Sequence, residues 1–269
     1  MLFDGRKSAK EKEEQLKKVV SQLAKAPKLV AIQVGHNPAS DIYLRLKREM
    51  AERIGIEFEL VNFPEDAKEE EIIEVISSAN KDEKVKGIMV QLPLPKEFNE
   101  FTILQAIDPK KDVDCLTMEN LGLVIAGEPR FFPATVKAVL EILEEAGVDK
   151  ENLVGKNACI VGGSNIVGKP LALVLSNMGA TISLCRSKTK DLAQFTTQAD
   201  ILVTATGVEG IIKEEMVKEG VIVIDVGAPK AEVDFENVNK KTSFITPVPG
   251  GVGPMTVVCL MENLVQGCK

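Results

Sequence analysis

Apolar and polar positions alternate along the chain in two patterns. Short apolar or alternating runs predict strands at residues 28–35, 57–63, 87–92, 158–161, 181–185, 201–205 and 221–226. Helix-start signals, or apolar positions gathered on one helical face, predict helices at residues 37–53, 69–79, 98–107, 134–146, 167–177 and 254–265. This alternation of strands and helices predicts an α/β fold with largely parallel sheets.

The pattern divides into two α/β series. Residues 127–133, rich in Gly and Pro, separate them and predict a linker. We therefore expect two lobes with a cleft between them, and the second lobe reads as a Rossmann-like dinucleotide-binding domain. Ligands of open α/β sheets bind beyond the carboxyl ends of the strands.

The composition of the chain excludes several classes of protein. The chain has 269 residues, with 33 Lys and Arg against 40 Asp and Glu, which gives a net charge of −7. This balance argues against nucleic-acid binding, which needs a dense cationic surface. The chain has no stretch of 18 consecutive apolar residues, so no membrane span is predicted. The N-terminal stretch is charged and lacks the apolar core of a signal peptide. We expect a cytoplasmic, small-molecule enzyme.

Cysteine and histidine usage excludes several kinds of site. Five cysteines, with no Cys-x-x-Cys pair, predict neither a disulfide framework nor a zinc site. The only histidine, His36, has no obvious partner for a catalytic triad or a metal site. We therefore predict no metal.

A glycine-rich loop, residues 161–170, follows a predicted strand and opens a predicted helix. This context suits phosphate binding, because free N–H groups at a helix start attract anions. Pro170 stands where a P-loop needs Ser or Thr, and Ser164 stands at the second Gly of the strict dinucleotide pattern. A dinucleotide loop and a plain structural turn both remain open on the pattern alone.

The end of the next strand bears on cofactor choice. An acid there favours NAD, whereas a cation accommodates the 2′-phosphate of NADP. The strand is followed by Arg186, Ser187 and Lys188, with no acid. Either these residues bind the phosphate, or they form an ordinary exposed cationic turn.

Lys47 interrupts an apolar helical stripe and lies one turn after Tyr43, the only tyrosine. Apolar surroundings lower the pKa of a lysine and make it a candidate general base. The alternative is a lysine whose stem packs at the rim of the core while its amine reaches water. Gln91, at the end of a predicted strand, either faces a cleft or is a buried structural glutamine.

Five motifs, in order along nearly the whole chain, resemble the bifunctional methylenetetrahydrofolate dehydrogenase/cyclohydrolase (FolD) family. The first comprises Val34-Gly35-His36-Asn37-Pro38-Ala39-Ser40 with Tyr43, Lys47 and Gly55-Ile56, and the second is Gly87-Ile88-Met89-Val90-Gln91-Leu92-Pro93-Leu94-Pro95. The others are Pro109-Lys110-Lys111-Asp112-Val113-Asp114, the glycine loop, and Ile245-Thr246-Pro247-Val248-Pro249-Gly250-Gly251-Val252-Gly253-Pro254-Met255-Thr256. The second and the last strings are highly specific.

The resemblance implies two reactions: NADP-dependent oxidation of 5,10-methylenetetrahydrofolate to the 5,10-methenyl form, then hydrolysis to 10-formyltetrahydrofolate. Lys47 would be the catalytic lysine, with Gln91 holding it and Asp114 orienting the pterin. Tyr43 would stack on the folate, and Gly253 and Thr256 would line the folate–nicotinamide junction. The domains implied are a folate-binding catalytic domain, residues 1–117, and a Rossmann NAD(P)-binding domain, residues 118–251. Helix 252–269 would pack back onto the first domain, and homodimers would form through the second.

The cofactor residues implied by the resemblance are Gly162, Gly163, Ser164, Val167, Gly168, Arg186, Ser187 and Ala228. Several positions depart from the family pattern, among them Ala228, which replaces a common Ile, and Pro133-Ala134-Thr135-Val136, which lacks the second Pro of its motif. Gly163 replaces an Arg that grips the 2′-phosphate in many relatives, and Arg186 replaces a His. We hypothesise that Arg186 supplies the missing cation and keeps NADP preferred, with NAD possible. Cys115 replaces the Gly that usually follows Asp114.

Two alternatives belong to other classes of protein. A short-chain reductase also uses Tyr-x-x-x-Lys, but there the motif should lie within the dinucleotide domain, whereas here it precedes the glycine loop. A non-catalytic nucleotide-sensing module would have no need to keep Lys47, Gln91 and Asp114 together.

Overall fold

The computed structural model describes residues 1–268, apart from the side chain of Ala39. The chain forms two compact units. The three-stranded unit comprises Lys10–Leu123, Pro129–Ala134 and the residues from Val257 onward. The five-stranded unit comprises Met1–Ala9, Val124–Glu128 and Thr135–Thr256. Both units are therefore assembled from separate segments of the chain.

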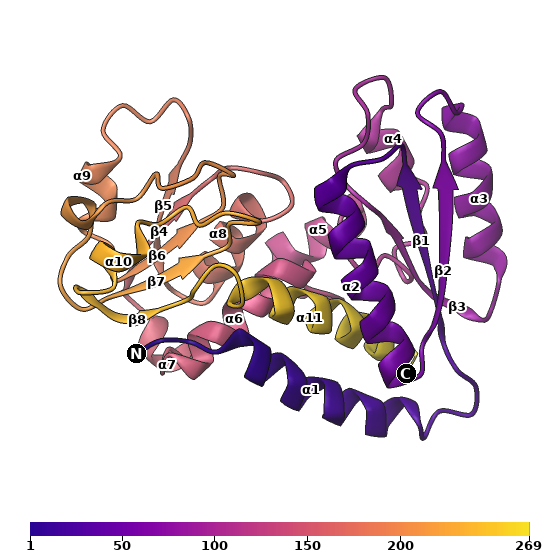
Figure 1. The fold of residues 1–269 in the computed structure, drawn as a ribbon, viewed down its shortest axis with the longest axis horizontal. Helices are drawn as coiled ribbons and strands as arrows, with labels where there is room; N and C mark the ends of the chain where they lie inside the picture. The colour runs from indigo at the N-terminus through magenta and orange to yellow at the C-terminus, as the bar shows by residue number, and fades with distance from the viewer. Residues whose placement is uncertain (269) are drawn as a thin grey trace. The chain divides into compact units, whose positions relative to one another are not determined.

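The three-stranded unit is built on a parallel sheet in the order β2-β1-β3 (Figure 1). Its strands are β1 (Lys28–Val34), β2 (Glu57–Phe63) and β3 (Val85–Val90). Its helices include α2 (Pro38–Ile54), α3 (Glu69–Lys81) and α4 (Glu100–Gln105). Apolar side chains of α3 and α4 form one core cluster with those of β1 and β3.

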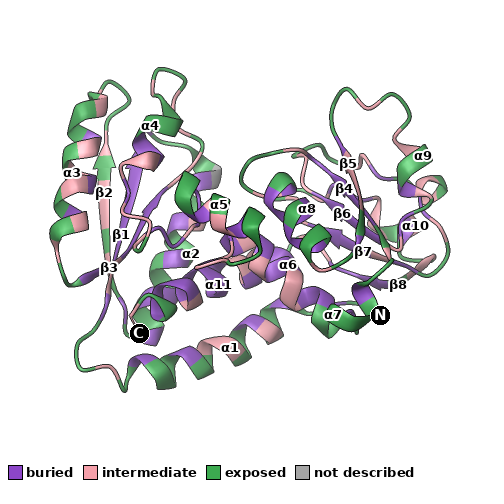
Figure 2. Ribbon diagram, turned by 180° about the vertical axis from the view of Figure 1, so that it is seen from behind, coloured by how far each residue is buried: buried purple, intermediate pink, exposed green. Residues whose placement is uncertain are grey.

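Burial explains the two kinds of strand pattern in this sheet. Strand β1 is central and almost wholly buried, which accounts for its continuous apolar run. Strand β2 lies at an edge, and its residues alternate between exposed and half-buried positions along much of its length (Figure 2). Helix α2 ends at Ile54 because Gly55 follows with a φ of +88°.

The five-stranded unit contains a parallel sheet in the order β5-β4-β6-β7-β8. Its strands are β4 (Asn157–Val161), β5 (Thr181–Cys185), β6 (Ile201–Thr204), β7 (Val221–Asp225) and β8 (Thr242–Ile245). The other elements are α6 (Ala134–Glu145), α7 (Lys150–Leu153), α8 (Gly168–Asn177), α9 (Ala193–Thr196), the 3₁₀ turn η1 (Glu214–Met216) and α10 (Phe235–Val238). The predicted α/β class with parallel sheets is confirmed.

The first residues of the chain extend this sheet beyond β8. The N–H of Phe3 donates to the carbonyl of Ile245 at 3.0 Å, and the N–H of Ile245 donates to the carbonyl of Met1 at 3.0 Å. Leu2 thus forms a parallel bridge with Ile245. The free edge of β8 is covered in this way.

The longer elements that were not predicted are α1 (Gly5–Val20) and α5 (Met118–Ala126). The short elements β8, α7, α9, η1 and α10 were not predicted either. The last helix, α11 (Val252–Gln266), begins two residues earlier than predicted, because Pro254 lies inside its first turn. It ends one residue after the predicted 265, and of the range 252–269 implied by the family resemblance, residue 269 lies outside the described residues.

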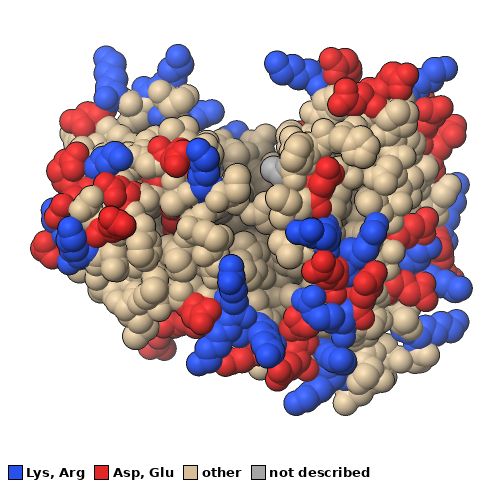
Figure 3. All heavy atoms as spheres, viewed as in Figure 1, with Lys and Arg blue, Asp and Glu red and all other residues tan. Residues whose placement is uncertain are grey.

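The surface carries both signs of charge. On the face shown in Figure 3, acidic and basic side chains are interspersed over both units. Among residues 1–268, no helix combines the length and the apolar character that crossing a bilayer requires.

Candidate active site and nucleotide-binding loops

Lys47 is buried on α2, with 8% of its surface exposed. Its Nζ donates to Oε1 of Gln91 at 3.2 Å, and the amide nitrogen of Gln91 donates to the carbonyl of Leu92 at 2.9 Å. Strand β3 ends at Val90, so Gln91 directly follows the strand, and its N–H donates to the carbonyl of Ile32 at 2.8 Å. Lys47 therefore does not reach out to solvent: its amine is held beside the end of the sheet.

The electrostatics of this site favour neutral forms. Burial lowers the pKa of Lys47, and the nearby Asp114 carboxylate partly opposes that shift. Burial raises the pKa of Asp114, with the Lys47 ammonium opposing the shift and Asp112 adding to it. Each group thus contributes to the pKa of the other, and the structure brings Lys47, Gln91 and Asp114 together.

Tyr43 lies one turn before Lys47 on α2 and is half-buried. Burial raises the pKa of its hydroxyl, so the phenol is neutral near pH 7. A neutral, partly exposed ring next to Lys47 offers a flat surface for stacking.

A buried network holds the loop that carries Asp114. Asp112 accepts hydrogen bonds from the N–H of Leu116 at 3.1 Å, from the N–H and hydroxyl of Thr117, both at 2.8 Å, and from the amide of Asn120 at 2.9 Å. Asp112 lies in the third motif but was given no role, and Asn120 was not singled out in the sequence. Their signal was only the polar stretch before a helix, which is common in loops.

Cys115 is the one non-glycine residue with positive φ, at +58°, among residues 1–268. Its side chain is buried, and its thiol donates to the carbonyl of Phe131 at 3.1 Å. Burial raises the pKa of this thiol. The position requires the left-handed conformation that glycine adopts most easily.

The glycine loop joins β4 to α8 in the five-stranded unit. A Cβ on Gly162 would lie 2.1 Å from the carbonyl oxygen of Ala205, and one on Gly168 would lie 1.7 Å from that of Gly162. Both positions therefore exclude any side chain. The hydroxyl of Ser164 accepts from the N–H of Val167 at 3.1 Å and lies 3.4 Å from the N–H of Gly168. The Ser164 hydroxyl thus orders the loop against the first N–H groups of α8.

Arg186 follows β5 and lies over the glycine loop. A Cβ on Gly163 would be 3.0 Å from its Nε and 3.1 Å from its Cγ. The backbone N–H of Arg186 donates to the hydroxyl of Thr189 at 2.9 Å, which fixes the turn. Arg186 and Ser187 are exposed, so their side chains are accessible to a ligand.

The remaining predicted site residues also belong to the five-stranded unit. Ala228 is exposed in the loop after β7, at the same edge of the sheet as the glycine loop. Gly253 and Thr256 are half-buried in the first turns of α11, and not in a loop before it. No hydrogen bond described for residues 1–268 joins either of them to Lys47.

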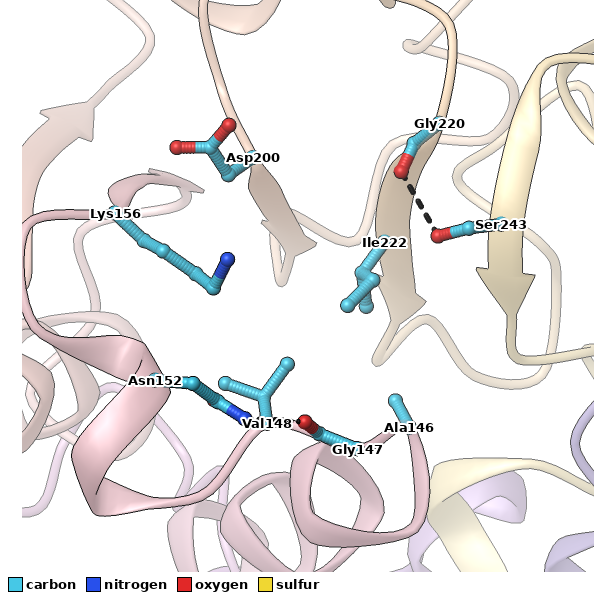
Figure 4. Close-up of a pocket in the computed structure, with 9 residues that line it drawn as sticks. All are labelled: Ala146, Gly147, Val148, Asn152, Lys156, Asp200, Gly220, Ile222 and Ser243. Atoms are coloured by element: carbon cyan, nitrogen blue, oxygen red, sulfur yellow. Dashed lines mark hydrogen bonds between the residues drawn. The ribbon is translucent and has the colours of Figure 1, made fainter.

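A cavity of about 330 Å³ lies at the amino ends of the strands of the five-stranded sheet (Figure 4), opposite the glycine loop. It is lined by residues that precede the strands, including Lys156, Asp200 and Gly220. The Lys156 side chain points into it, and the Ser243 hydroxyl donates to the carbonyl of Gly220 at 2.8 Å. Nucleotides bind at the carboxyl ends of such strands, so this cavity is not the predicted cofactor site.

Two family models together match most of the chain. The model of the tetrahydrofolate dehydrogenase/cyclohydrolase catalytic domain matches residues 3–114, and the model of the NAD(P)-binding domain matches residues 133–269. The "Bifunctional protein FolD" of Methanococcoides burtonii is 46% identical, covering 100% of this chain and 96% of the relative.

Two solved structures are similar over the whole chain. The bifunctional FolD dehydrogenase/cyclohydrolase of Campylobacter jejuni has a TM-score of 0.96 and 42% identity, covering 100% of this chain and 98% of the other. The Trypanosoma brucei enzyme, complexed with NADP and an inhibitor, has a TM-score of 0.95 and 34% identity, covering 100% and 97%. The chain belongs to the tetrahydrofolate dehydrogenase/cyclohydrolase family.

Proposed function

We infer that this chain catalyses both reactions of its family. It oxidises 5,10-methylenetetrahydrofolate to the 5,10-methenyl form with NADP, and it hydrolyses that product to 10-formyltetrahydrofolate. The observation that carries this inference is the buried Lys47 amine, held by Gln91 at 3.2 Å and coupled to Asp114. This arrangement provides a base without any metal or nucleophilic triad.

Lys47 acts as the general base of the hydrolysis. Its lowered pKa increases the fraction of free amine near neutral pH, and a cationic methenyl substrate nearby would lower the pKa further. The free amine takes a proton from the water that attacks the bridge carbon. The carbinol then loses its hydroxyl proton while N5 gains one, and the bond between N5 and the carbon breaks.

Gln91, Asp114 and Tyr43 position Lys47 and the substrate. Gln91 donates to Leu92 and accepts from Lys47, so both ends of its amide are fixed and the amine is oriented. Asp114 offers a carboxylate to the pterin N–H groups, and Tyr43 offers a ring face for stacking. Gly253 and Thr256 complete the proposed substrate-binding set.

The five-stranded unit fits a dinucleotide. Gly162 and Gly168 leave the backbone bare at the start of α8, and Arg186 places a cation over Gly163. Ser164, Val167, Ser187 and Ala228 complete the proposed cofactor set. When bound, NADP accepts a hydride from the methylene carbon of the folate. Arg186 favours NADP over NAD because it can pair with the 2′-phosphate.

The domain division, assembly and compartment are part of the proposal. Residues 1–117, with helix 252–269 packed back onto them, are assigned to the folate-binding domain and residues 118–251 to the nucleotide-binding domain, although the segment Met1–Ala9 lies in the five-stranded unit. The anchoring of α11 supports this, because the Asn263 amide donates to the carbonyls of Val113 and Phe132, both at 2.8 Å. The protein acts in the cytoplasm as a homodimer joined through the nucleotide-binding domain.

The test uses the purified chain with 5,10-methylenetetrahydrofolate and NADP, following reduced nucleotide and methenyl absorbance together. We expect reduced nucleotide without lasting methenyl. Lys47→Met should then let methenyl accumulate, because the variant has no base for hydrolysis but keeps part of the oxidation. Arg45→Met, an exposed position on the same helix, is the matched control and should behave as wild type. Undiminished hydrolysis in Lys47→Met would remove Lys47 from its role.

A further inference from the structure

Two carboxylates are buried in the five-stranded unit and take no part in the function described above. Asp225, the last residue of β7, is 2% exposed, and Glu232, in the loop that follows, is 1% exposed. Carboxylates are rarely buried unless their oxygens are fully engaged. Their hydrogen-bond partners therefore indicate what they do.

Asp225 binds the loop that follows its own strand. One carboxylate oxygen accepts from the N–H of Gly227 at 2.8 Å, and the other accepts from the N–H groups of Glu232 at 2.8 Å and Val233 at 3.0 Å. A Cβ on Gly227 would lie 2.8 Å from Oδ1 of Asp225 and 2.6 Å from the carbonyl of Lys230. The loop that presents Ala228 is thus wrapped tightly around one carboxylate.

Glu232 binds the loop after the neighbouring strand β6. Its carboxylate accepts from the N–H of Thr206 at 2.8 Å, from the hydroxyl of Thr206 at 2.8 Å, and from the N–H of Gly207 at 2.6 Å. Because Asp225 fixes the backbone of Glu232, the two acids form a chain. This chain links the loop after β7 to the loop after β6.

The same chain of contacts reaches the glycine loop. Ala205, directly before Thr206, donates its N–H to the carbonyl of Val161 at 2.8 Å. Its own carbonyl oxygen lies 2.1 Å from the position that a Cβ on Gly162 would occupy. A shift of Thr206 would therefore be transmitted to the backbone of the glycine loop.

These loops share one edge of the sheet, the carboxyl ends of β4, β6 and β7, where dinucleotides bind in such folds. We propose that Glu232 and Asp225 are positioning residues for the dinucleotide, fixing the three loops in the geometry that binds it. The proposal rests on the function proposed above, because it assigns these acids to the NADP step and not to hydrolysis. The acids act through backbone N–H groups and do not themselves contact the cofactor.

Glu232→Gln tests the proposal because it keeps the size of the side chain. The amide nitrogen of glutamine is a donor, so it cannot accept the N–H and hydroxyl groups that now donate to the Glu232 carboxylate. The loop after β6 would therefore shift. We expect the Kd for NADP, measured by calorimetric titration, to rise about tenfold, with a matching rise in the KM for NADP. The KM for the folate and the hydrolysis of added methenyltetrahydrofolate should stay at wild-type values. Glu209→Gln, at an exposed glutamate paired with Lys230, is the matched control and should change none of these.

Each titration is run well below the unfolding midpoint of the variant, so that loss of fold does not mimic loss of affinity. A lowered unfolding midpoint with an unchanged Kd would show a purely structural role and overturn the proposal. If Glu232→Gln does not fold, Thr206→Ala removes one bond to Glu232 and should raise the Kd, whereas Thr206→Ser should restore it. An unchanged Kd in Thr206→Ala would then overturn the proposal.

The outcome is separable from that of the proposed function. A wild-type chain that binds NADP but oxidises no methylenetetrahydrofolate would contradict the proposed function, while the Kd comparison would still decide the role of Glu232. A wild-type chain that binds no NADP would overturn both.

Discussion

The side chain of Arg186 fills the space that Gly163 leaves open: its Nε lies 3.0 Å from where a Cβ on Gly163 would stand. A side chain at residue 163 would therefore compete with Arg186 for the same position. Under the proposal, Arg186 at the end of β5 supplies the cation for the 2′-phosphate from beside the glycine loop.

Arg186→Ala should lower kcat/KM for NADP about 10- to 100-fold and leave kcat/KM for NAD nearly unchanged, since only NADP carries the 2′-phosphate. The measurement is the ratio of the two constants in steady-state assays at one salt concentration. Lys190→Ala removes an exposed cation a few residues away and serves as the control. If the ratio of kcat/KM for NADP to that for NAD is unaltered in Arg186→Ala, Arg186 does not bind the 2′-phosphate.

The hydrolysis should depend on pH through Lys47. The free amine is the active form, so the rate should rise with pH and level off above the pKa of Lys47, which burial places below its ordinary value of 10.5. Lys47→Arg should abolish this rise and lower the rate at least about 100-fold, because guanidinium stays protonated. The measurement is the decay of methenyl absorbance across pH, with the uncatalysed decay subtracted. A variant that kept the wild-type pH profile would exclude Lys47 as the base.

Asp114→Asn should move the same profile to lower pH. The Asp114 carboxylate raises the pKa of Lys47, so its removal leaves burial unopposed and the pKa falls further. The midpoint of kcat against pH reports this shift independently of any loss of folate affinity, which appears in KM. A midpoint that moved to higher pH would contradict the assigned coupling between the two groups.

Substitutions at Cys115 should reverse the usual order of glycine and alanine. In helices and strands, a variant with Ala is more stable to unfolding than one with Gly by about 0.5–1 kcal/mol. At residue 115 the φ of +58° disfavours any residue that carries a Cβ. Cys115→Gly should therefore be more stable than Cys115→Ala by about 1 kcal/mol. Urea unfolding midpoints of the two variants measure the difference. The ordinary order, with Ala above Gly, would show that the loop relaxes at this position.

Sequence pattern predicted the elements that form the two sheets better than those around them. The continuous apolar run of β1 and the alternation of β2 follow directly from their central and edge positions. Helix α1 was missed because charged residues dominate it, and its buried positions, such as Leu16 and Val20, are few. Strand β8 was missed because only two of its four residues, Phe244 and Ile245, are apolar, whereas the equally short β6 is a continuous apolar run up to Thr204.

Only those residues of the candidate site that stand out in a local sequence pattern were predictable. Lys47 is conspicuous because a charge breaks an apolar stripe, and the glycine loop has its own local pattern. Asp112 and Glu232 carry no such signal: a carboxylate in a polar loop looks solvated until its backbone partners are known. Their importance depends on hydrogen bonds across several residues or between neighbouring loops, which no local pattern contains.

The bridge between Leu2 and Ile245 also has a consequence for biosynthesis. The segment around Leu2 pairs with a strand that is synthesised more than two hundred residues later, so this edge of the five-stranded sheet closes only after Ile245 has been made. The other unit recruits its final helical residues from Val257 onward. Neither unit can therefore be excised by cutting the gene at one place, and a gene for either unit alone would need rejoined or permuted segments.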